Sequence, residues 1–226
     1  MSDNKERRGR EHNAEASRRA ILNAAEEVFS TSGFVGARVD EIAARAGYNK
    51  SLLFQYFGDK LNLYTEVLKR ADQATNHVRA QLLSPLFMDD KIATDRHRFE
   101  AFLKGMIRAN FDYLVEHPRV LRILMWEMAD NWKTYAKISP QFSQEELEPF
   151  EKVCRNALEA GLLRSDFAPI IQLTIMQPLC QIFLAYLPIY QLSFPNENMN
   201  SSEALDRARE FIVNLIVSGI FCGPND

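Results

Sequence analysis

Residues 39–57 (VDEIAARAGYNKSLLFQYF) constrain the fold of this chain more than any other stretch. Apolar residues recur at helical spacing in the first half, and Gly47 follows where a left-handed residue can end a helix. Asn49 is of the residue type that caps the start of a helix, here the segment Lys50–Phe57. The stretch is therefore predicted to fold as two short helices joined by a tight turn.

The second of these helices has two different faces. Leu53, Tyr56 and Phe57 recur at i, i+3 and i+4, so we expect them to pack inward. The other face carries Ser51, Leu52, Phe54 and Gln55. Glutamine can pair with adenine edges in the major groove and apolar side chains can contact thymine methyls, so this face suits DNA. Two short amphipathic helices around a glycine also occur in many other helical proteins, and both interpretations stay open at this point.

A longer segment carries a family resemblance. The runs ILNAAEEVFSTSGF (21–34) and VDEIAARAGYNKSLLFQYFGDKLNLYTEVL (39–68) resemble the N-terminal domain of TetR-family transcriptional regulators. The shared pattern is a helix ending in F-x-x-x-G-F, an IA-x-x-A-G turn, a short helix ending in aromatic residues, and a lysine opening the next helix. Several positions depart from the usual family residues, so the operator sequence does not follow from the resemblance: Arg38, Ser51, Leu52, Phe54 and Gln55.

The resemblance implies a sequence-specific DNA-binding transcriptional regulator, most simply a repressor that releases its operator when a small effector binds. Arg38 and Lys60 flank the second helix on either side, so we expect them to contact phosphates. The full set of expected DNA-binding residues is Arg38, Lys50, Ser51, Leu52, Phe54, Gln55, Tyr56 and Lys60.

The charge distribution agrees with contact to DNA at one end only. The net charge is −3, with +2 over residues 1–70 and −5 over the remainder. A slightly basic head on an acidic body suits a protein that touches phosphate with its head. The first residues are charged rather than signal-like, and we read no apolar run near the roughly 20 residues that span a bilayer. We therefore expect a cytoplasmic protein without a membrane partner.

The helical periodicity predicts an all-α fold of about nine helices. We expect a flexible tail with several basic residues over 1–16, a three-helix helix-turn-helix DNA-binding domain over 17–62, and an effector-binding and dimerisation domain over 63–226. The helices of this last domain and the one that leads into it are expected at about 60–83, 96–116, 118–131, 143–161, 168–191 and 203–221. A capping box is expected at Ser143 and Glu146, and the 168–191 helix is expected to bend at Pro178 and to end near Pro188.

The helices 168–191 and 203–221 are strongly apolar. They could be ordinary core, whereas the resemblance implies that they pair with their symmetry mates in a homodimer. A dimer also follows from the DNA-binding head, because one short helix reads too few bases for useful specificity. Two heads reading a palindromic operator solve this.

The middle helices are rich in aromatic residues and methionine, a pattern that is more often core than pocket. The resemblance implies that this region holds a small effector, and such a lining would suit an apolar one. The expected pocket residues are Phe102, Met106, Phe111, Met125, Trp126, Glu127 and Gln177. Glu127 could instead face solvent or pair with a nearby arginine.

Motifs of catalysis are missing from the sequence. The four histidines have no helical partner, and there is no nucleophile elbow, phosphate loop or dinucleotide fingerprint. Cys154, Cys180 and Cys222 are far apart, which favours reduced thiols over disulfides or zinc ligands. We therefore expect no enzyme, cofactor or metal. The alternatives are a TetR-fold DNA-binding protein without a small effector and, far less favoured, a helical ligand-binding or hydrolytic protein. The operator, the effector, the regulated genes and the direction of regulation are not encoded in any motif.

Overall fold

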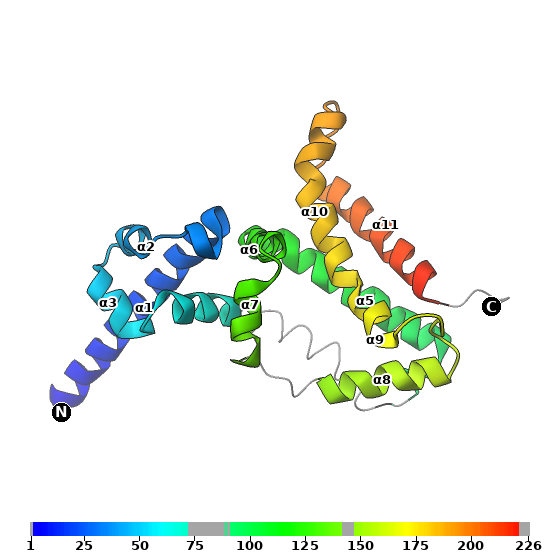
Figure 1. Ribbon diagram of the computed structural model, residues 1–226, viewed down its shortest axis with the longest axis horizontal. Helices are drawn as coiled ribbons and strands as arrows, with labels where there is room; N and C mark the ends of the chain where they lie inside the picture. Colours follow the sequence, from blue (N-terminus) through cyan, green and yellow to red (C-terminus); the bar gives the residue numbers. More distant parts are fainter. Residues whose placement is uncertain (1, 72–88, 90, 142–146, 222–226) are drawn as a thin grey trace. The chain divides into compact units, whose positions relative to one another are not determined.

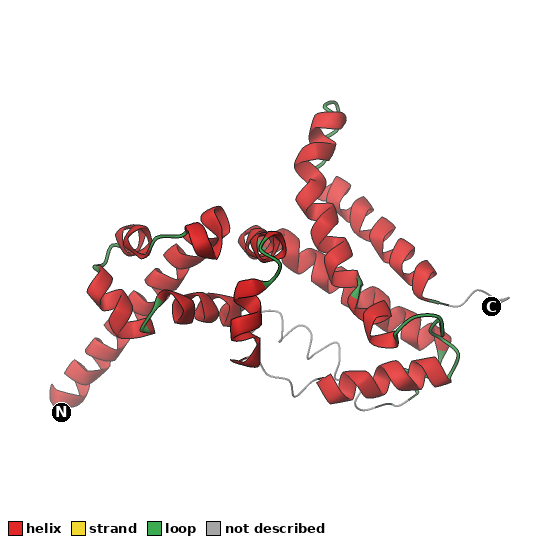
Figure 2. Cartoon of the chain, in the orientation of Figure 1, coloured by secondary structure: helices red, strands yellow, loops and turns green. Residues whose placement is uncertain are grey.

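The computed structural model describes residues 2–71, 89, 91–141 and 147–221. Every regular element within these ranges is a helix (Figures 1 and 2). The β structure found there is an isolated antiparallel bridge between Leu163 and Phe221. The all-α prediction is confirmed.

The chain divides into two compact units. The first consists of Met1–Gln73 and Arg119–Phe142, and the second of Ala74–Pro118 and Ser143–Asp226. This division differs from the expected boundary after residue 62, because residues 119–142 pack with the N-terminal helices.

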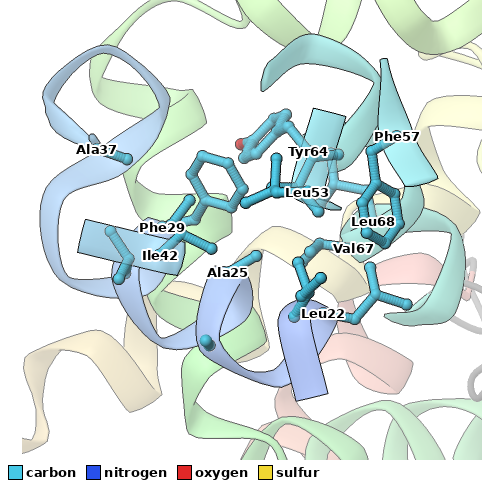
Figure 3. Close-up of a cluster of buried hydrophobic side chains, with 14 of the residues drawn as sticks. Leu22, Ala25, Phe29, Ala37, Ile42, Leu53, Phe57, Tyr64, Val67 and Leu68 are labelled. Atoms are coloured by element: carbon cyan, nitrogen blue, oxygen red, sulfur yellow. The ribbon is translucent and has the colours of Figure 1, made fainter. Parts of the chain in front are cut away.

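The first unit is built around one hydrophobic core. Its elements are α1 (Ser2–Gly36), α2 (Val39–Ala46), α3 (Lys50–Phe57), a helix of residues 60–71, α6 (Pro118–Ala129), α7 (Lys133–Ile138) and the short 3-10 helix η1 (Ser139–Gln141). Figure 3 shows side chains of α1, α2, α3 and the 60–71 helix converging, among them Phe29, Ile42, Leu53, Phe57 and Tyr64. Ile123 of α6 and Ile138 of α7 belong to the same buried cluster.

The second unit contains α5 (Arg96–Glu116), α8 (Leu147–Glu159), α9 (Pro169–Thr174), α10 (Met176–Ser193) and α11 (Ser202–Ile220). The buried face of α5 packs against α10 and α11, and the rings of Phe111 and Phe183 lie 6.2 Å apart. Arg108 of α5 donates two hydrogen bonds to Glu210 of α11, at 2.9 and 2.7 Å. The expected helices 96–116 and 203–221 are confirmed to within one residue.

The first helix begins earlier than expected. α1 starts at Ser2, so residues 2–16 are helical where we expected a flexible tail. These residues carry no apolar stripe, but Glu, Lys, Arg and Ala are strong helix formers and Glu6 precedes Arg10 by one turn. Helix propensity, and not apolar periodicity, was the signal for this part of α1. Gly33 interrupts the far end with φ 65° and ψ 178°, close to the expected stop.

Two prolines act differently from our expectation for the helix 168–191. The break lies at Ile175, between α9 and α10, and not at Pro178. Pro178 is the third residue of α10, where the backbone N–H has no partner within the helix in any case. Pro188 lies inside α10, which continues to Ser193.

The expected helix 118–131 also ends sooner. α6 stops at Ala129, and Asn131 and Trp132 adopt left-handed conformations with φ 55° and 58°. This turn starts α7, which the sequence did not predict. The capping box at Ser143 and Glu146 and the expected continuation of the 60–71 helix to residue 83 lie outside the described residues.

We expected no apolar run long enough to span a bilayer, and this expectation is wrong, because one helical stretch has the length and the composition of a membrane span. The 25-residue stretch Pro169–Ser193 spans α9 and α10, and its most apolar 18-residue window has a mean hydropathy of 1.6 and is 33% buried within the structure. One such helix is weak evidence for a membrane span, since helices of soluble proteins have the same composition. Cys154 and Cys180 are buried free thiols, and burial raises the pKa of each to about 11. Cys222 lies outside the described residues.

Candidate nucleic-acid interface

The turn between α2 and α3 has the geometry that the sequence predicts. Gly47 lies in the left-handed region with φ 75°, and its N–H points to the carbonyls of Ala43 and Ala44. The N–H of Tyr48 donates to the carbonyl of Ala43 at 3.0 Å. Asn49 caps α3, because its side-chain oxygen accepts a hydrogen bond of 2.8 Å from the N–H of Leu52. The two helices are thereby held in a helix-turn-helix arrangement.

The inner face of α3 fixes its orientation in the unit. Leu53 and Phe57 are buried in the core of Figure 3, and Tyr56 is half-buried. Because α3 has only eight residues, these contacts leave it little freedom to roll on α2. The expected inward direction is confirmed for Leu53 and Phe57, and Tyr56 lies at the border.

The outer face of α3 presents Ser51, Phe54 and Gln55 to solvent. Leu52 is half-buried and so is less available than we expected. Phe54 keeps 38% of its surface exposed, unusual for a phenylalanine on a small helix. A polar amide beside an exposed ring is a combination that can read a base edge and contact a thymine methyl.

Lys50, at the start of α3, has a partner that the sequence did not reveal. Its ammonium lies 3.0 Å from the carboxylate of Asp40 in the first turn of α2, and both side chains are about half exposed or more. The same ammonium lies 5.9 Å from the centre of the Phe54 ring. The charge of Lys50 is therefore partly neutralised, and its contact with DNA stays a prediction.

Lys60 follows α3, which we call the recognition helix, and its side chain also contacts other residues of the first unit. Its ammonium donates to the carbonyl of Val35 at 3.3 Å and lies 4.7 Å from the centre of the Phe34 ring. Burial lowers its pKa. These contacts hold the side chain beside the end of α1, and its contact with phosphate stays a prediction. Arg38 precedes α2 and is exposed.

Arg18 contacts other helices of the first unit, although its side chain is 45% exposed. Arg18 forms an ion pair with Glu66 and lies 5.3 Å from the centre of the Phe57 ring. It therefore links α1 to α3 and to the 60–71 helix. A sequence pattern does not show such a role, because Arg18 and Glu66 are 48 residues apart.

The seven expected effector-pocket residues divide between the two units. Met125, Trp126 and Glu127 lie on α6 in the first unit, and the other four lie on α5 and α10 in the second: Phe102, Met106, Phe111 and Gln177. Met106 and Phe111 are buried, Phe102 is half-buried and Gln177 is exposed. Glu127 neither faces solvent nor pairs with an arginine, because it is 3% exposed and bonded to Tyr64 and Tyr135. A pocket lined by all seven stays a prediction.

Asn110 on α5 carries a buried polar atom in the described part of the second unit. The side-chain nitrogen of Asn110 on α5 is buried without a hydrogen-bond partner, although the side chain lies near the thiol of Cys180 on α10. Within the part of the chain that the structure describes, no group of three or more His, Cys, Asp or Glu side chains is arranged to hold a metal ion.

Comparisons with known proteins agree with this architecture. Residues 21–67 match the model of the bacterial regulatory proteins of the tetR family, and residues 100–216 match the model of the tetracyclin repressor-like C-terminal domain. The second match alone covers more than half of the chain.

Curated relatives cover the chain in part. The chain is 34% identical over 113 residues to the HTH-type transcriptional repressor SCO4008 of Streptomyces coelicolor, which is 50% of each protein. It is 32% identical over 118 residues to the repressor NicS of Pseudomonas putida, or 52% of this chain and 51% of that protein. It is 35% identical over 136 residues to the activator FasR of Mycolicibacterium smegmatis, or 55% and 57%. The chain thus spans about half the length of the curated relatives that it matches.

Solved structures share the fold over nearly the whole chain. The transcriptional regulator SCO4942 of Streptomyces coelicolor has a TM-score of 0.60 and 24% identity, with 90% of this chain and 98% of that chain covered. The fatty acid degradation regulator FadR of Bacillus halodurans has a TM-score of 0.61 and 16% identity, with 90% and 95% covered. These identities are informative about the fold alone. The two family models, the helix-turn-helix geometry and the shared fold together show that the chain belongs to the TetR family of bacterial regulatory proteins.

Proposed function

We propose that this protein is a cytoplasmic, sequence-specific DNA-binding transcriptional regulator. The observation that carries the proposal is the outer face of α3, where Ser51, Phe54 and Gln55 stand exposed on a helix that the core holds from behind. Phosphate contacts position a protein on the duplex and base contacts specify the sequence. Lys50, Lys60 and Gln55 offer both kinds of contact on one short segment.

A dimer is supported by the apolar surface of the second unit. Six large side chains on α9, on α10 and at the residue between them are substantially exposed and recur every three or four residues: Ile171, Ile175, Leu179, Ile182, Tyr186 and Ile189. Phe211 and Leu215 add a second exposed pair on α11, at 64% and 56%. Burying one such side chain contributes about 1.5–3 kcal/mol. The proposed homodimer forms through α9, α10 and α11 and presents two heads to a palindromic operator.

A small effector is supported by Asn110. A buried donor without a partner destabilises a protein by roughly 1–3 kcal/mol. An effector with an apolar body and one acceptor oxygen would satisfy this group within the aromatic and aliphatic interior around α5. The rival function is a TetR-family regulator that binds no small effector, in which Asn110 is only a local defect.

The direction of regulation is proposed as repression, by analogy with two of the relatives named above, while FasR is an activator. Repression with release by the effector requires that DNA and effector weaken each other by the same factor.

The test of the proposed function is selection of DNA from a random-sequence pool by the full chain. We expect enrichment of an inverted repeat whose half-site centres lie about 34 Å apart, or a multiple of that distance. Gln55→Ala should weaken binding to the selected duplex. Arg155→Ala removes an exposed positive charge from α8 in the second unit and serves as the control with unchanged affinity. A pool without any enriched sequence would overturn the proposal.

A further inference from the structure

Glu127 of α6 carries a buried carboxylate that is hydrogen-bonded to two other elements of the first unit. Glu127 is 3% exposed, and a buried carboxylate lowers the free energy of unfolding strongly unless it is hydrogen-bonded. The hydroxyl of Tyr64 donates to Oε1 at 2.5 Å, and the backbone N–H of Tyr135 donates to Oε2 at 2.9 Å. Each oxygen therefore holds a different element, the 60–71 helix on one side and α7 on the other.

We call the two hydrogen bonds of Glu127, to Tyr64 and to Tyr135, the Glu127 clasp. Its Tyr64 side lies in the core of the DNA-binding head. The Tyr64 ring packs edge-on against the Phe29 ring, with 4.8 Å between the ring centres (Figure 3). The centre of the Phe34 ring lies 5.1 Å from that of Tyr64. Both phenylalanines belong to α1. The hydrogen bond to Glu127 is thus attached to a side chain that already contacts the centre of the head.

The adjacent residue on α6 makes a second attachment. The indole N–H of Trp126 donates to the carbonyl of Ser30 on α1 at 3.2 Å. Its ring lies against Gly33, where an added Cβ would come within 3.1 Å of the indole and where φ is +65°. Gly33 therefore permits both the bend in α1 and the close approach of Trp126. Two consecutive residues of α6 fasten it to two different helices of the head.

The Tyr135 end closes the turn between α6 and α7. Asn131 and Trp132 both have left-handed backbones, which are strained for residues other than glycine. The bond from the N–H of Tyr135 to Glu127 spans this turn. The carboxylate thus stabilises the turn between α6 and α7, whose left-handed residues are unfavourable by themselves.

We propose that Glu127 is a positioning residue that makes α6–α7 and the DNA-binding head one rigid body. The inference rests on the proposed function. α6 follows α5 after a single residue, His117, and α5 belongs to the second unit. A displacement of α6 is then transmitted to the 60–71 helix through Glu127 and to α1 through Trp126. Without these contacts each head would be less rigid, and a dimer would engage two half-sites less well.

A pair of variants separates this role from simple stability. Tyr64→Phe combined with Glu127→Met removes the hydroxyl and the carboxylate together, and replacing both partners of a buried bond by apolar groups of similar shape is often nearly neutral. Glu127→Gln is the conservative control, because its amide can accept from the N–H of Tyr135 and donate to the oxygen of Tyr64.

The experiment measures three quantities for each variant: the melting temperature, the affinity for the full inverted repeat selected by the wild-type protein, and the affinity for a duplex carrying one half-site. For the double variant we expect a modestly lowered melting temperature, because the N–H of Tyr135 loses its acceptor, together with unchanged half-site affinity and full-operator affinity lowered by about 10-fold, within the usual range of coupling between sites. Glu127→Gln should match the wild type in all three.

Two results would overturn the inference. One is an unchanged ratio of full-operator to half-site affinity in the double variant. The other is a parallel loss of both affinities together with a lowered melting temperature, which would make Glu127 a purely structural residue. If the wild-type protein selects no sequence at all, the proposed function fails first and this inference falls with it.

Discussion

Asp40→Asn should strengthen operator binding while weakening the fold. Asp40 neutralises Lys50 at 3.0 Å, at the start of the recognition helix. When DNA approaches, this pair must open or bring a carboxylate toward the phosphates. The substitution frees the lysine in advance, so DNA binding no longer includes the loss of the ion pair.

The magnitude follows from the exposure of the pair. The side chains of Lys50 and Asp40 are 49% and 62% exposed, so the pair is worth about 0.2–1 kcal/mol per head. For the two heads of a dimer the affinity should rise about 2-fold to 30-fold. The slope of log affinity against log salt should steepen by up to about 2, one freed lysine in each head. Asp40 also lies in the first turn of α2, so its loss should lower the free energy of unfolding by about 0.3–1 kcal/mol.

The assay is fluorescence anisotropy of a labelled operator at several salt concentrations, with urea unfolding of the free protein beside it. Glu41→Gln is the matched control, since it removes the neighbouring charge of the same helix turn, whereas Arg45 keeps its contact with Glu27 at 2.5 Å. The control should leave the salt slope unchanged. Asp40→Asn combined with Lys50→Met should lose the gain. Unchanged or weaker binding by Asp40→Asn alone, at every salt concentration, would refute the reasoning.

Three further perturbations test other parts of the structure. Ile182→Arg on α10 should convert the dimer to a monomer in analytical ultracentrifugation and reduce operator affinity by at least about 10-fold, because a charge would enter the apolar stripe; a variant that stays dimeric would contradict the proposed interface. Asn110→Leu should raise the free energy of unfolding by about 1 kcal/mol in urea unfolding by removing a buried unpaired donor, while weakening any effector that stabilises the wild type; a destabilised variant would contradict this account. The Arg108 guanidinium is the main reason why the pKa of Glu210 is held at about 2. Glu210→Gln should therefore lower the free energy of unfolding at pH 7 by at most about 1 kcal/mol, because the pair is exposed, and this difference from the wild type should vanish as the pH falls from about 4.5 to 2. An equal difference at pH 7 and pH 2 would contradict the ion-pair explanation.

The sequence predicted best where local rules decide the structure. The cap at Asn49, the left-handed Gly47 and the buried pair Leu53 and Phe57 all follow from residue type and helical spacing. The same is true of α5, which its apolar periodicity and the following proline define to the residue. Such features need no knowledge of the rest of the chain.

Contacts between distant residues were out of reach. Lys50 meets Asp40 across a turn, and Tyr64 meets Glu127 across 63 residues. No periodicity encodes either pair, because each depends on how whole helices pack. A glutamate among apolar residues in LMWEM was a visible signal, but it did not show which partner the carboxylate would find.

The remaining misses have two physical causes. Helix propensity without an apolar stripe extends α1 back to Ser2, a signal that periodicity ignores. The first turn of α10 tolerates Pro178, and Pro188 lies inside the same helix. Neither proline therefore marks the break at Ile175. The packing of residues 119–142 with the head likewise needs the tertiary structure.

The central claim, that the exposed face of α3 reads DNA bases, is tested most directly by repeating the selection from random DNA with Gln55→Ala. A residue that reads a base edge specifies that base, whereas a phosphate contact carries no sequence information. We expect the variant to enrich the same inverted repeat with relaxed preference at one base pair, at the symmetric position of both half-sites. Enrichment of a repeat identical to that of the wild type at every position would contradict the account.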